Sequence, residues 1–492
     1  MKKSEGGFSP LISVDRRLRR PLQLQVGDAF RSAIVNGNLR PGEQIPSTRS
    51  LASELGISRI PVLNAYAQLL AEGFFETRVG AGTFVSSSLP NQLARSEDRD
   101  ARSARVRRMT RAIARRTSFL PHYTPPAWTR GQGPFSLSQP AVHDFPFRVW
   151  SNLVSRYCRN LRLTALQYGD PMGHEELRKA VGTYLRASRG VMCEWQQIMI
   201  VSGSQQALDI SARVLLEVGS SVWIEDPGYW LARQVFAAGG CRLVPVPVDD
   251  EGLNVAAGIE RCRKPRAIYV TPSHQFPLGG TMSASRRFQL LDWVQTSGSW
   301  IVEDDYDSEY RYHTKPIASL QGLDRNSRVI YIGTFSKVLF PAMRVGYVVI
   351  PSDLVDHFVA VRHAIDVSPP HLYQAVLADF INEGHFSRHV RRMRLAHGER
   401  REVLVDCINK ELGSAFQICG AAAGLHLTLR LPRGYRDVAV SERAARQNLW
   451  LWPLSPSYFG PTSQQGLILG FGGMTAGGIP HAVRRLRAIL TN

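Results

Sequence analysis

Apolar residues recur with helical spacing in three stretches near the start of the chain. Residues 22–35 carry the longest such pattern, and Asn36-Gly37 ends it. Shorter helices are expected through residues 51–55 and 60–72, with Ser58 as a cap and Pro61 in a first turn, where its missing N–H costs little. Helix, glycine turn and helix predict a helix-turn-helix, although three short amphipathic helices can also form a purely structural bundle.

A β-hairpin is expected directly after the third helix. Residues 74–78 and 83–85 have the character of short strands, and Val79-Gly80-Ala81-Gly82 joins them. A hairpin in this position is typical of the wing of a winged helix, whose flexible glycine tip can approach a nucleic-acid backbone.

From about residue 135 onward the pattern changes to alternating strands and helices. The expected strands are residues 198–201, 222–224, 243–248, 267–270, 300–302, 329–332 and 345–350. Helical stretches at 358–381 and 386–412 and strands at 424–429 and 467–471 indicate a small C-terminal α+β part. The fold class is therefore predicted to be α/β, with a mostly parallel sheet covered by helices.

A stretch without apolar periodicity separates the two regions. It holds nine arginines between Arg95 and Arg116, followed by prolines and glycines, which is typical of a linker. The arginines are either solvated or add contacts to phosphates. We expect a helix-turn-helix domain over residues 14–87, a basic linker over 88–132 and an α/β domain over 133–492, with its small subdomain at about 370–492.

Positive charge is concentrated at the N-terminal end. The 492 residues carry a net charge of +19. Residues 1–120 contribute +10 of it, with 20 Lys and Arg against 10 Asp and Glu. This asymmetry favours double-stranded DNA as a partner of the first domain, although a basic, soluble arm has the same composition.

The cysteines and the first residues bear on the compartment. The six cysteines form no CxxC pair, which indicates neither a zinc site nor a disulfide framework. Met1-Lys2-Lys3 is followed by polar and glycine residues, and no run of about 18 apolar residues occurs. We therefore expect a cytoplasmic protein that does not span a membrane.

Polar or aromatic clusters follow four of the expected strands. They are Glu225-Asp226-Pro227-Gly228-Tyr229, Thr271-Pro272-Ser273-His274-Gln275, Glu303-Asp304-Asp305-Tyr306 and the segment that contains Lys337. Since ligands of open α/β sheets bind beyond the carboxyl ends of the strands, the four clusters are expected to share one crevice. By itself the acidic cluster fits a solvated loop better than a site.

The Lys337 segment has the composition of a site for a phosphorylated aldehyde. Thr334 and Ser336 offer hydroxyls, Lys337 an amine and Arg344 a planar fork that suits a phosphate, so pyridoxal phosphate (PLP) is the candidate. The turn at residues 202–206 exposes backbone donors at a helix N-terminus, which also suits a phosphate. Without these neighbours, a lysine between two strands would be a solvated loop residue.

Two stretches resemble a known family of proteins. PSTRSLASELGISRIPVLNAYAQLLAEGFFETRVGAGTFV is similar to the winged helix of GntR regulators, and the EDPGY, TPSHQFPLG, EDDYDSEY and TFSK segments resemble the MocR subfamily, which adds a fold type I aminotransferase-like domain. The first resemblance implies DNA contacts by Arg49, Ser58, Arg59, Arg78, Gly80 and Gly82. Ile60-Pro61 departs from the polar pair usual in relatives.

The second resemblance implies a role for each residue of the PLP site. Lys337 is the implied Schiff-base lysine, Asp304 the partner of the pyridine nitrogen, Tyr306 that of the ring hydroxyl, and Tyr229 the stacking aromatic. Ser204, Gln205, Thr334, Ser336 and Arg344 form the implied phosphate cup. His274 stands in the loop where enzymes carry Asn-Pro-Thr-Gly. We expect a PLP-dependent regulator that senses PLP or an amino compound as a head-to-tail homodimer on operator DNA; the alternative is a working aminotransferase with a DNA-binding appendage.

Two arginines that bind carboxylates in some relatives are missing here. One position is Leu231, two residues after the stacking tyrosine, and the other lies among Pro456, Ser457 and Tyr458. Without such a fork, the sequence predicts neither an amino-acid response nor efficient transamination.

Overall fold

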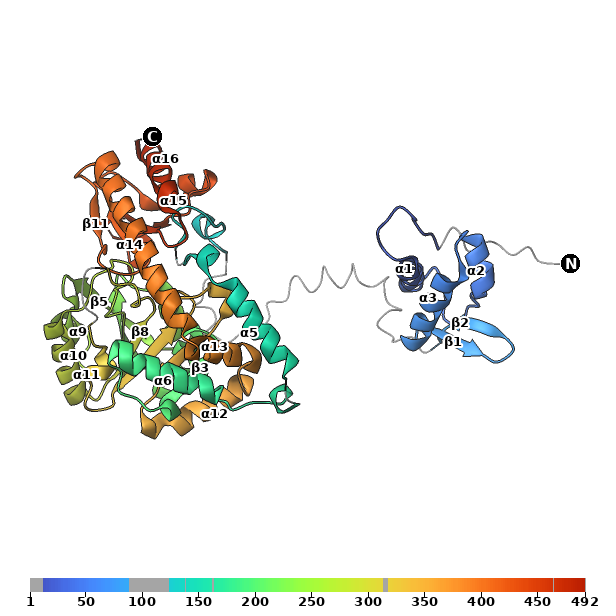
Figure 1. Ribbon diagram of the computed structural model, residues 1–492, viewed down its shortest axis with the longest axis horizontal. Helices are drawn as coiled ribbons and strands as arrows, with labels where there is room; N and C mark the ends of the chain where they lie inside the picture. The colour runs from blue at the N-terminus through green and yellow to red at the C-terminus, as the bar shows by residue number, and fades with distance from the viewer. Residues whose placement is uncertain are drawn as a thin grey trace. The chain divides into compact units, whose positions relative to one another are not determined.

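The chain forms two compact units, each with its own core. The computed structural model describes residues 12–87 and 124–491, apart from 138, 162, 313–316 and 463. Contacts divide the chain into residues 1–112 and 113–492 (Figure 1). The expected linker, 88–132, lies outside the described residues up to 123, and the domain boundaries stay predictions.

The N-terminal unit has the expected helices and hairpin. Its elements are α1 (Leu22–Val35), α2 (Thr48–Glu54), α3 (Arg59–Ala71), β1 (Phe75–Arg78) and β2 (Gly82–Val85), and the two strands pair antiparallel. The Ser47 hydroxyl caps α2 by accepting from the Ser50 N–H at 3.1 Å. The rings of Phe30, Tyr66 and Phe75 meet edge to face with centroids 5.2–5.6 Å apart, so helices and hairpin share one core.

An eight-stranded sheet is the centre of the C-terminal unit. Across the sheet the strands are β3 (Ile198–Val201), β10 (Gly346–Val349), β9 (Val329–Thr334), β8 (Trp300–Asp305), β7 (Ala267–Val270), β4 (Ser221–Asp226), β5 (Arg242–Asp249) and β6 (Gly252–Leu253). From β9 to β5 neighbours run parallel, whereas β10 and β6 run antiparallel to their neighbours. The prediction of a mostly parallel sheet is confirmed.

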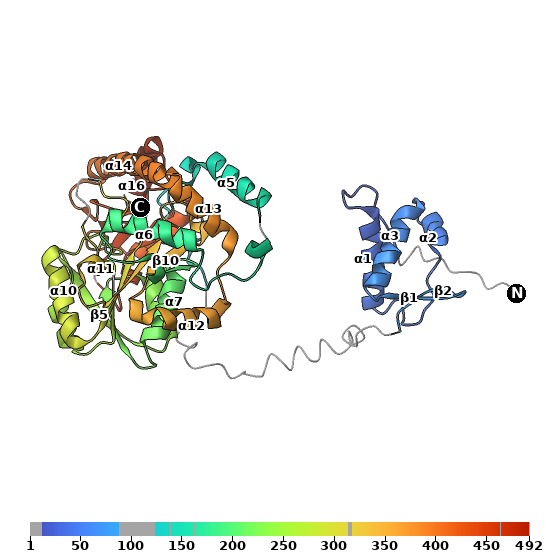
Figure 2. The ribbon, with the colours of Figure 1, turned by 60° about the horizontal axis from the view of Figure 1, so that its bottom comes forward.

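Helices cover both faces of this sheet because its strands are apolar on both sides. Ile198 and Ile200 of β3 contribute to one core, and Met199 and Val201 to the other. One face packs against α5 (Phe147–Arg159), α6 (Glu175–Arg189), α13 (His371–Asn382), α9 (Val255–Arg261), α10 (Ala284–Ser297) and α11 (Leu320–Leu323), and the other against α7 (Ser204–Leu215), α8 (Trp230–Ala238) and α12 (Val355–Asp366). Figure 2 shows β10 between α6 and α7.

The single helix expected over residues 358–381 is wrong. The structure has two helices there, since α12 ends at Asp366 and α13 begins at His371. Val367 takes a positive φ of 63°, and Pro369-Pro370 has no backbone N–H to continue the ladder. The apolar periodicity continues on both sides of this break in the helix, but the two prolines indicate it.

A second, antiparallel sheet forms the C-terminal part. Its order is β11 (Gln417–Cys419), β12 (His426–Arg430), β14 (Gly466–Gly470) and β13 (Trp452–Pro453), packed with α15 (Asp437–Arg446), α16 (Ile479–Thr491) and the end of α14 (His385–Leu412). Figure 1 shows α14 running from the layer of α13 to this part. We call it the small subdomain; its boundary near residue 370 stays a prediction.

The segment that enters the unit is attached to the small subdomain. Phe135 is fully buried in that subdomain's core, and its carbonyl accepts from the Gly470 N–H at 3.1 Å. The Trp450 N–H donates to the Pro134 carbonyl at 3.0 Å. A Cβ at Gly131 would lie 2.0 Å from the Trp450 ring, so only glycine allows this close approach.

Short 3₁₀ helices complete the structure. They are η2 (Ala127–Thr129), η3 (Val142–Asp144), η4 (Leu163–Leu166), η5 (Trp195–Gln197), η6 (Pro341–Met343), η7 (Ser352–Leu354), η8 (Ser455–Ser457) and η9 (Ala476–Gly478). The six cysteines are free thiols. None of the helices in the described part of the chain has the length and apolar character of a membrane span.

Candidate functional site

One cavity lies at the carboxyl ends of neighbouring strands β9, β8, β7 and β4. Its volume is about 150 Å³. It is lined by Ser204, Gln205, Tyr229, Leu231, Tyr269, Thr271, Phe276, Asp304, Tyr306, Thr334, Ser336, Lys337 and Arg344. Nine of the ten residues expected at a PLP site therefore surround one space; His274 does not line it.

Lys337 projects its amine into this cavity from the loop after β9. Burial lowers the pKa of Lys337 to about 8, although Asp307 and Asp304 act in the opposite direction. Arg344 adds to the lowering by charge repulsion. Near neutral pH, a far larger fraction of this amine is neutral than of an ordinary lysine, and the neutral form is the one that attacks an aldehyde.

The opposite end of the cavity is built for an anion. Helix α7 begins at Ser204, directly after Gly203 with φ of 85°, so its free N–H groups face the cavity end. The Arg344 Nη2 donates to the Ser202 carbonyl at 2.7 Å, and a Cβ at Gly203 would lie 2.9 Å from the same nitrogen. The Ser336 Oγ is buried and has no partner among the described residues. Helix dipole, guanidinium and hydroxyl together favour a phosphate.

Asp304 is the member of the acidic cluster that reaches the cavity. The Tyr269 hydroxyl donates to its Oδ2 at 2.8 Å, whereas its Oδ1 is buried without a partner among the described residues. Burial raises the pKa of Asp304 to about 7. Glu303 instead accepts from backbone N–H groups at the start of α11, and Asp305 from the Tyr331 hydroxyl at 2.6 Å. The strand's alternation therefore places the middle carboxyl at the site.

Aromatic side chains form the remaining wall. The Tyr229 and Phe276 rings meet edge to face with centroids 5.4 Å apart. Thr271, from a cluster expected to share the crevice, lines the cavity, whereas sequence reasoning missed Tyr269 and Phe276. Tyr269 could have been found, because it alternates with Thr271 at the end of β7 beside β8.

His274 lies behind Tyr306 and reaches the cavity only through it. The Tyr306 hydroxyl donates to the His274 carbonyl at 2.9 Å, and the His274 Nδ1 lies 3.0 Å from Asp307 Oδ2. Ligand atoms of His274, Asp307 and His426 lie within 4.8 Å of one another, a spacing that a metal ion can bridge. Hydrogen bonds already engage them, since Asp307 also accepts from the Leu425 N–H at 3.3 Å and the His426 Nε2 lies 3.3 Å from the Pro277 carbonyl.

The residues present fit PLP. Three buried polar atoms of the cavity lack partners among the described residues: Asp304 Oδ1, Ser336 Oγ and Gln205 Nε2. Buried polar groups are normally satisfied, so unpartnered ones in the lining of a cavity indicate a ligand that supplies the missing partners. The lining combines a carboxylate, an anion cup and a reactive amine, the set of groups that suits a phosphorylated pyridine aldehyde.

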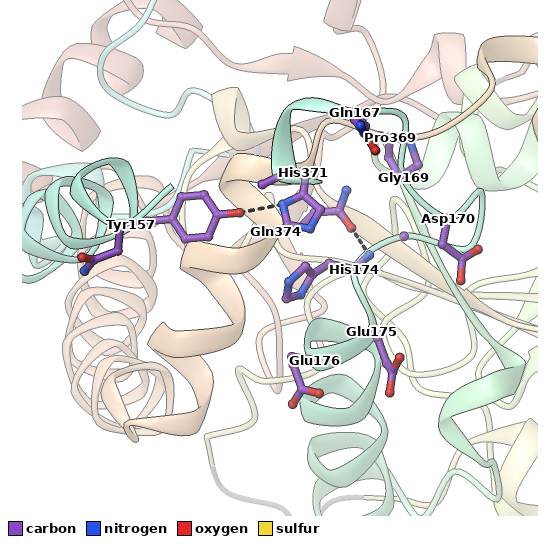
Figure 3. Close-up of a pocket in the computed structure, with 13 residues that line it drawn as sticks. Tyr157, Gln167, Gly169, Asp170, His174, Glu175, Glu176, Pro369, His371 and Gln374 are labelled. Atoms are coloured by element: carbon purple, nitrogen blue, oxygen red, sulfur yellow. Dashed lines mark hydrogen bonds between the residues drawn. The ribbon is translucent and has the colours of Figure 1, made fainter. Parts of the chain in front are cut away.

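A second hollow, of about 590 Å³, shares no lining residue with this cavity. In Figure 3 Tyr157 reaches from α5 to His371, and their Oη and Nδ1 atoms lie 2.8 Å apart. The rings of His174 and His371 meet at 4.6 Å, and burial lowers the pKa of both. No residue that the sequence singled out lines this hollow, although the exposed Leu166 and Tyr168 lie in the segment that does.

The surface of the N-terminal unit carries the residues expected to meet DNA. Arg49, Ser58 and Arg59 are exposed, and the Arg59 Nε donates to the Thr48 hydroxyl at 3.1 Å, so the starts of α2 and α3 are adjacent. Exposed Ile60, on α3, was not anticipated as part of this surface.

The wing has the geometry that its glycines predict. Gly80 and Gly82 take positive φ angles of 75° and 110°. Arg78 pairs with Glu76 at 2.9 Å and stacks over the Phe84 ring at 4.5 Å. The hairpin therefore holds one arginine on its exposed surface.

Comparisons with known proteins match both units. Residues 22–85 match the bacterial regulatory proteins of the gntR family, and residues 143–486 match aminotransferase class I and II. The probable rhizopine catabolism regulatory protein MocR of Rhizobium meliloti is 38% identical over 97% of this chain and 95% of that protein. The pyridoxine biosynthesis regulator PdxR of Corynebacterium glutamicum is 28% identical over 91% of each chain. LysN, an alpha-aminoadipate aminotransferase of Thermus thermophilus whose crystal structure is known, is 30% identical with a TM-score of 0.68, covering 73% of this chain and 91% of that one.

Proposed function

Because the chain belongs to the MocR subfamily of GntR-type regulators, we propose that it is a transcriptional regulator whose operator binding depends on PLP, or on an amino compound that reacts with PLP, at Lys337. The observation that carries this proposal is one cavity whose lining combines Lys337, an unpartnered carboxylate oxygen of Asp304 and an anion cup. The family implies PLP binding, and DNA binding by the winged helix.

Each side chain of the cavity has a proposed task. PLP, when bound, supplies an aldehyde carbon open to amines and a ring that withdraws electrons. Lys337 holds it covalently, and Asp304 keeps the ring nitrogen protonated. The remaining proposed contacts are Tyr306 at the ring hydroxyl, Tyr229 on the ring face, and Ser204, Gln205, Thr334, Ser336 and Arg344 at the phosphate, with His274 supporting Tyr306.

The DNA-binding part of the proposal rests on exposed side chains at helix starts. Arg49 and Arg59, beside Ser58, are free to reach phosphates and guanine edges of an operator. Arg78 and the tip at Gly80 and Gly82 would contact the backbone. Exposed Ile60 suits the methyl group of a thymine.

We also propose a head-to-tail homodimer, since aminotransferase relatives are typically dimers. Leu166 and Tyr168 are 68% and 87% exposed and adjoin in sequence Ala165, Gln167 and Gly169, which line the second hollow, so we take them as candidates for burial in the dimer. We expect Leu166→Asp to raise the dimer dissociation constant at least about tenfold in sedimentation experiments, because it buries an unpaired carboxylate. Val218→Asp, at an exposed apolar residue away from this hollow, is the matched control; equal effects of the two changes would argue against this interface.

The alternative function is a working aminotransferase with a DNA-binding appendage. The two readings separate when operator affinity and turnover are measured on the same full-length protein, freed of PLP and then reloaded. We expect reloading to change the operator dissociation constant at least about fivefold, as is usual for coupled sites. We expect no repeated turnover with an amino donor and a keto acid; many turnovers without any change in DNA affinity would favour the enzyme.

A further inference from the structure

We propose that the effector of the Lys337 cavity is a primary amine with an apolar body and no carboxylate group. This inference rests on the proposed function, because it assumes that an amine displaces Lys337 from PLP. It concerns the part of the cavity wall that would face the substituent of the amine. The side chains at the centre of this wall are not among the proposed PLP contacts.

The wall is apolar. Phe276 lines the cavity and packs in one cluster with Leu137 and Ile468, all of them less than 9% exposed. Tyr229, Tyr306 and Trp452 pack against the same cluster, and Leu231 also lines the cavity. Hydrocarbon or aromatic substituents of a ligand would bury area here at about 25 cal/mol per Å².

Positive charge is absent from this wall. Among the residues that line the cavity, the only cations are Lys337 and Arg344. Lys337 is the covalent anchor, and Arg344 is held at the opposite end, where its Nη2 donates to the Ser202 carbonyl. Arg344 is therefore not left to pair with a carboxylate on the effector. Lys337 is bonded to PLP until the amine displaces it, and burial lowers its pKa to about 8, so the freed amine is a weaker partner for a carboxylate than an arginine.

Arg233, two residues after Leu231, is the nearest arginine in sequence, but both Nη atoms of its guanidinium are engaged elsewhere, and only its Nε is buried without a partner among the described residues. The Nη1 donates to the Tyr458 carbonyl at 3.0 Å, and the Nη2 to the carbonyls of Gly228 and Ser457. The guanidinium also lies 4.6 Å from the centroid of the Phe459 ring. Burial lowers its pKa to about 10, yet it stays charged at neutral pH.

Further hydrogen bonds join the same two segments of the chain. The Gly228 N–H donates to the Ser457 carbonyl at 3.0 Å, and the Phe459 N–H donates to Asp226 Oδ1 at 2.9 Å. Together with Arg233 they form a latch between residues 226–233 and 457–459. The chain itself thus supplies a link between its two sheets that does not require a carboxylate from the effector.

Buried acids make a further carboxylate unfavourable. Besides Asp304, Glu225 is buried against the lining residue Thr271, whose hydroxyl donates to it at 2.6 Å. Burial raises the pKa of Glu225 to about 7. An effector carboxylate would be desolvated near these groups without an arginine to pair with, which is unfavourable.

The exchange that the proposal assumes is balanced. In the exchange, the C=N bond between PLP and Lys337 would be replaced by a C=N bond between PLP and the incoming amine. The amine would give up both of its nitrogen-bound hydrogens, and Lys337 would leave as a free –NH2 group that carries two hydrogens. No oxidant or reductant is needed. A low pKa at Lys337 suits a group that must alternate between free amine and bonded nitrogen.

The test compares two ligands that differ only in the carboxylate. The PLP-loaded full-length protein is titrated with 2-phenylethylamine and with L-phenylalanine, and both the visible absorbance of bound PLP and the operator affinity are followed. We expect 2-phenylethylamine to act at a concentration at least about tenfold lower, the ratio that one unpaired buried polar group imposes. Equal or better binding of L-phenylalanine, or no response to either ligand, overturns the inference.

A charge placed on the wall provides an independent variant. Leu231→Arg adds a guanidinium at a half-buried lining position, and Leu395→Arg adds one at a side chain that is 72% exposed on α14. We expect only Leu231→Arg to improve the response to L-phenylalanine relative to 2-phenylethylamine, at least about tenfold. An unchanged ratio in a variant with wild-type thermal stability contradicts the inference.

The measurements distinguish a failure of the proposed function from a failure of the proposed effector class. If the protein retains no PLP, or if PLP has no effect on operator affinity, the proposed function fails. If PLP binds and affects operator affinity but the carboxylate-bearing ligand is preferred, the function stands and only the class of effector is wrong.

Discussion

Lys337→Ala is expected to abolish covalent retention of PLP. The alanine variant keeps the anion cup and Asp304 but has no amine to bond the aldehyde, so PLP is held by non-covalent contacts alone. We expect its affinity to fall about 100-fold, which is equivalent to about 2.7 kcal/mol. After borohydride reduction and denaturation, wild-type protein should keep PLP absorbance and Lys337→Ala should not.

Lys179→Ala is the matched control for this experiment. Lys179 is exposed on α6, where it pairs with Glu175 and Glu176, and it does not line the cavity. The control should retain PLP as the wild type does. Covalent label on Lys337→Ala at the wild-type level would falsify the assignment of Lys337, and peptide mapping would then identify the lysine that reacts.

Replacing Arg49 and Arg59 together by alanine is expected to remove operator binding while PLP binding stays intact. The two side chains are exposed at the starts of α2 and α3, and their loss leaves the buried core of the unit unchanged. A lost arginine contact to a guanine costs about 1–3 kcal/mol, so the pair should weaken binding about 100-fold or more. Fluorescence anisotropy with operator DNA at one fixed salt concentration measures this.

The control for this double variant removes the same charge elsewhere. Arg213 and Arg487 are 58% and 53% exposed in the C-terminal unit. Arg213→Ala with Arg487→Ala lowers the net charge equally and should leave operator affinity within about twofold, since surface charges away from the interface act only through screened fields. Equal losses in both double variants would mean that net charge, and not the winged helix, determines binding.

The sequence predicted local elements well where apolar spacing and caps agree. The helix expected at residues 22–35 matches α1, and the hairpin at Gly80 and Gly82 forms as the turn residues require. The break between α12 and α13 was missed because periodicity was weighed above Pro369-Pro370. Two prolines without a backbone N–H interrupt the hydrogen bonds of a helix, even where the apolar pattern continues on both sides of them.

Predictions for the site succeeded where a strand fixes the direction of side chains. Asp304 lines the cavity and Glu303 does not, as alternation along β8 requires. The loop after β7 has no such period, so the sequence singled out His274 where the cavity is lined by Phe276. The apolar wall also escaped notice, since Leu137 and Ile468 are distant in sequence and meet only through the fold. The roles of the residues stay predictions for the experiments above.

The attachment of residues 134 and 135 to the small subdomain has a mechanical consequence. Residues 134 and 135 hydrogen-bond to Trp450 and Gly470 of the small subdomain, and not to the sheet that carries Lys337. The hydrogen bonds of Arg233 join the small subdomain to the part of the unit that contains the eight-stranded sheet. Because residues 134 and 135 are attached to the small subdomain, any shift of that subdomain relative to the eight-stranded sheet would move these two residues with it.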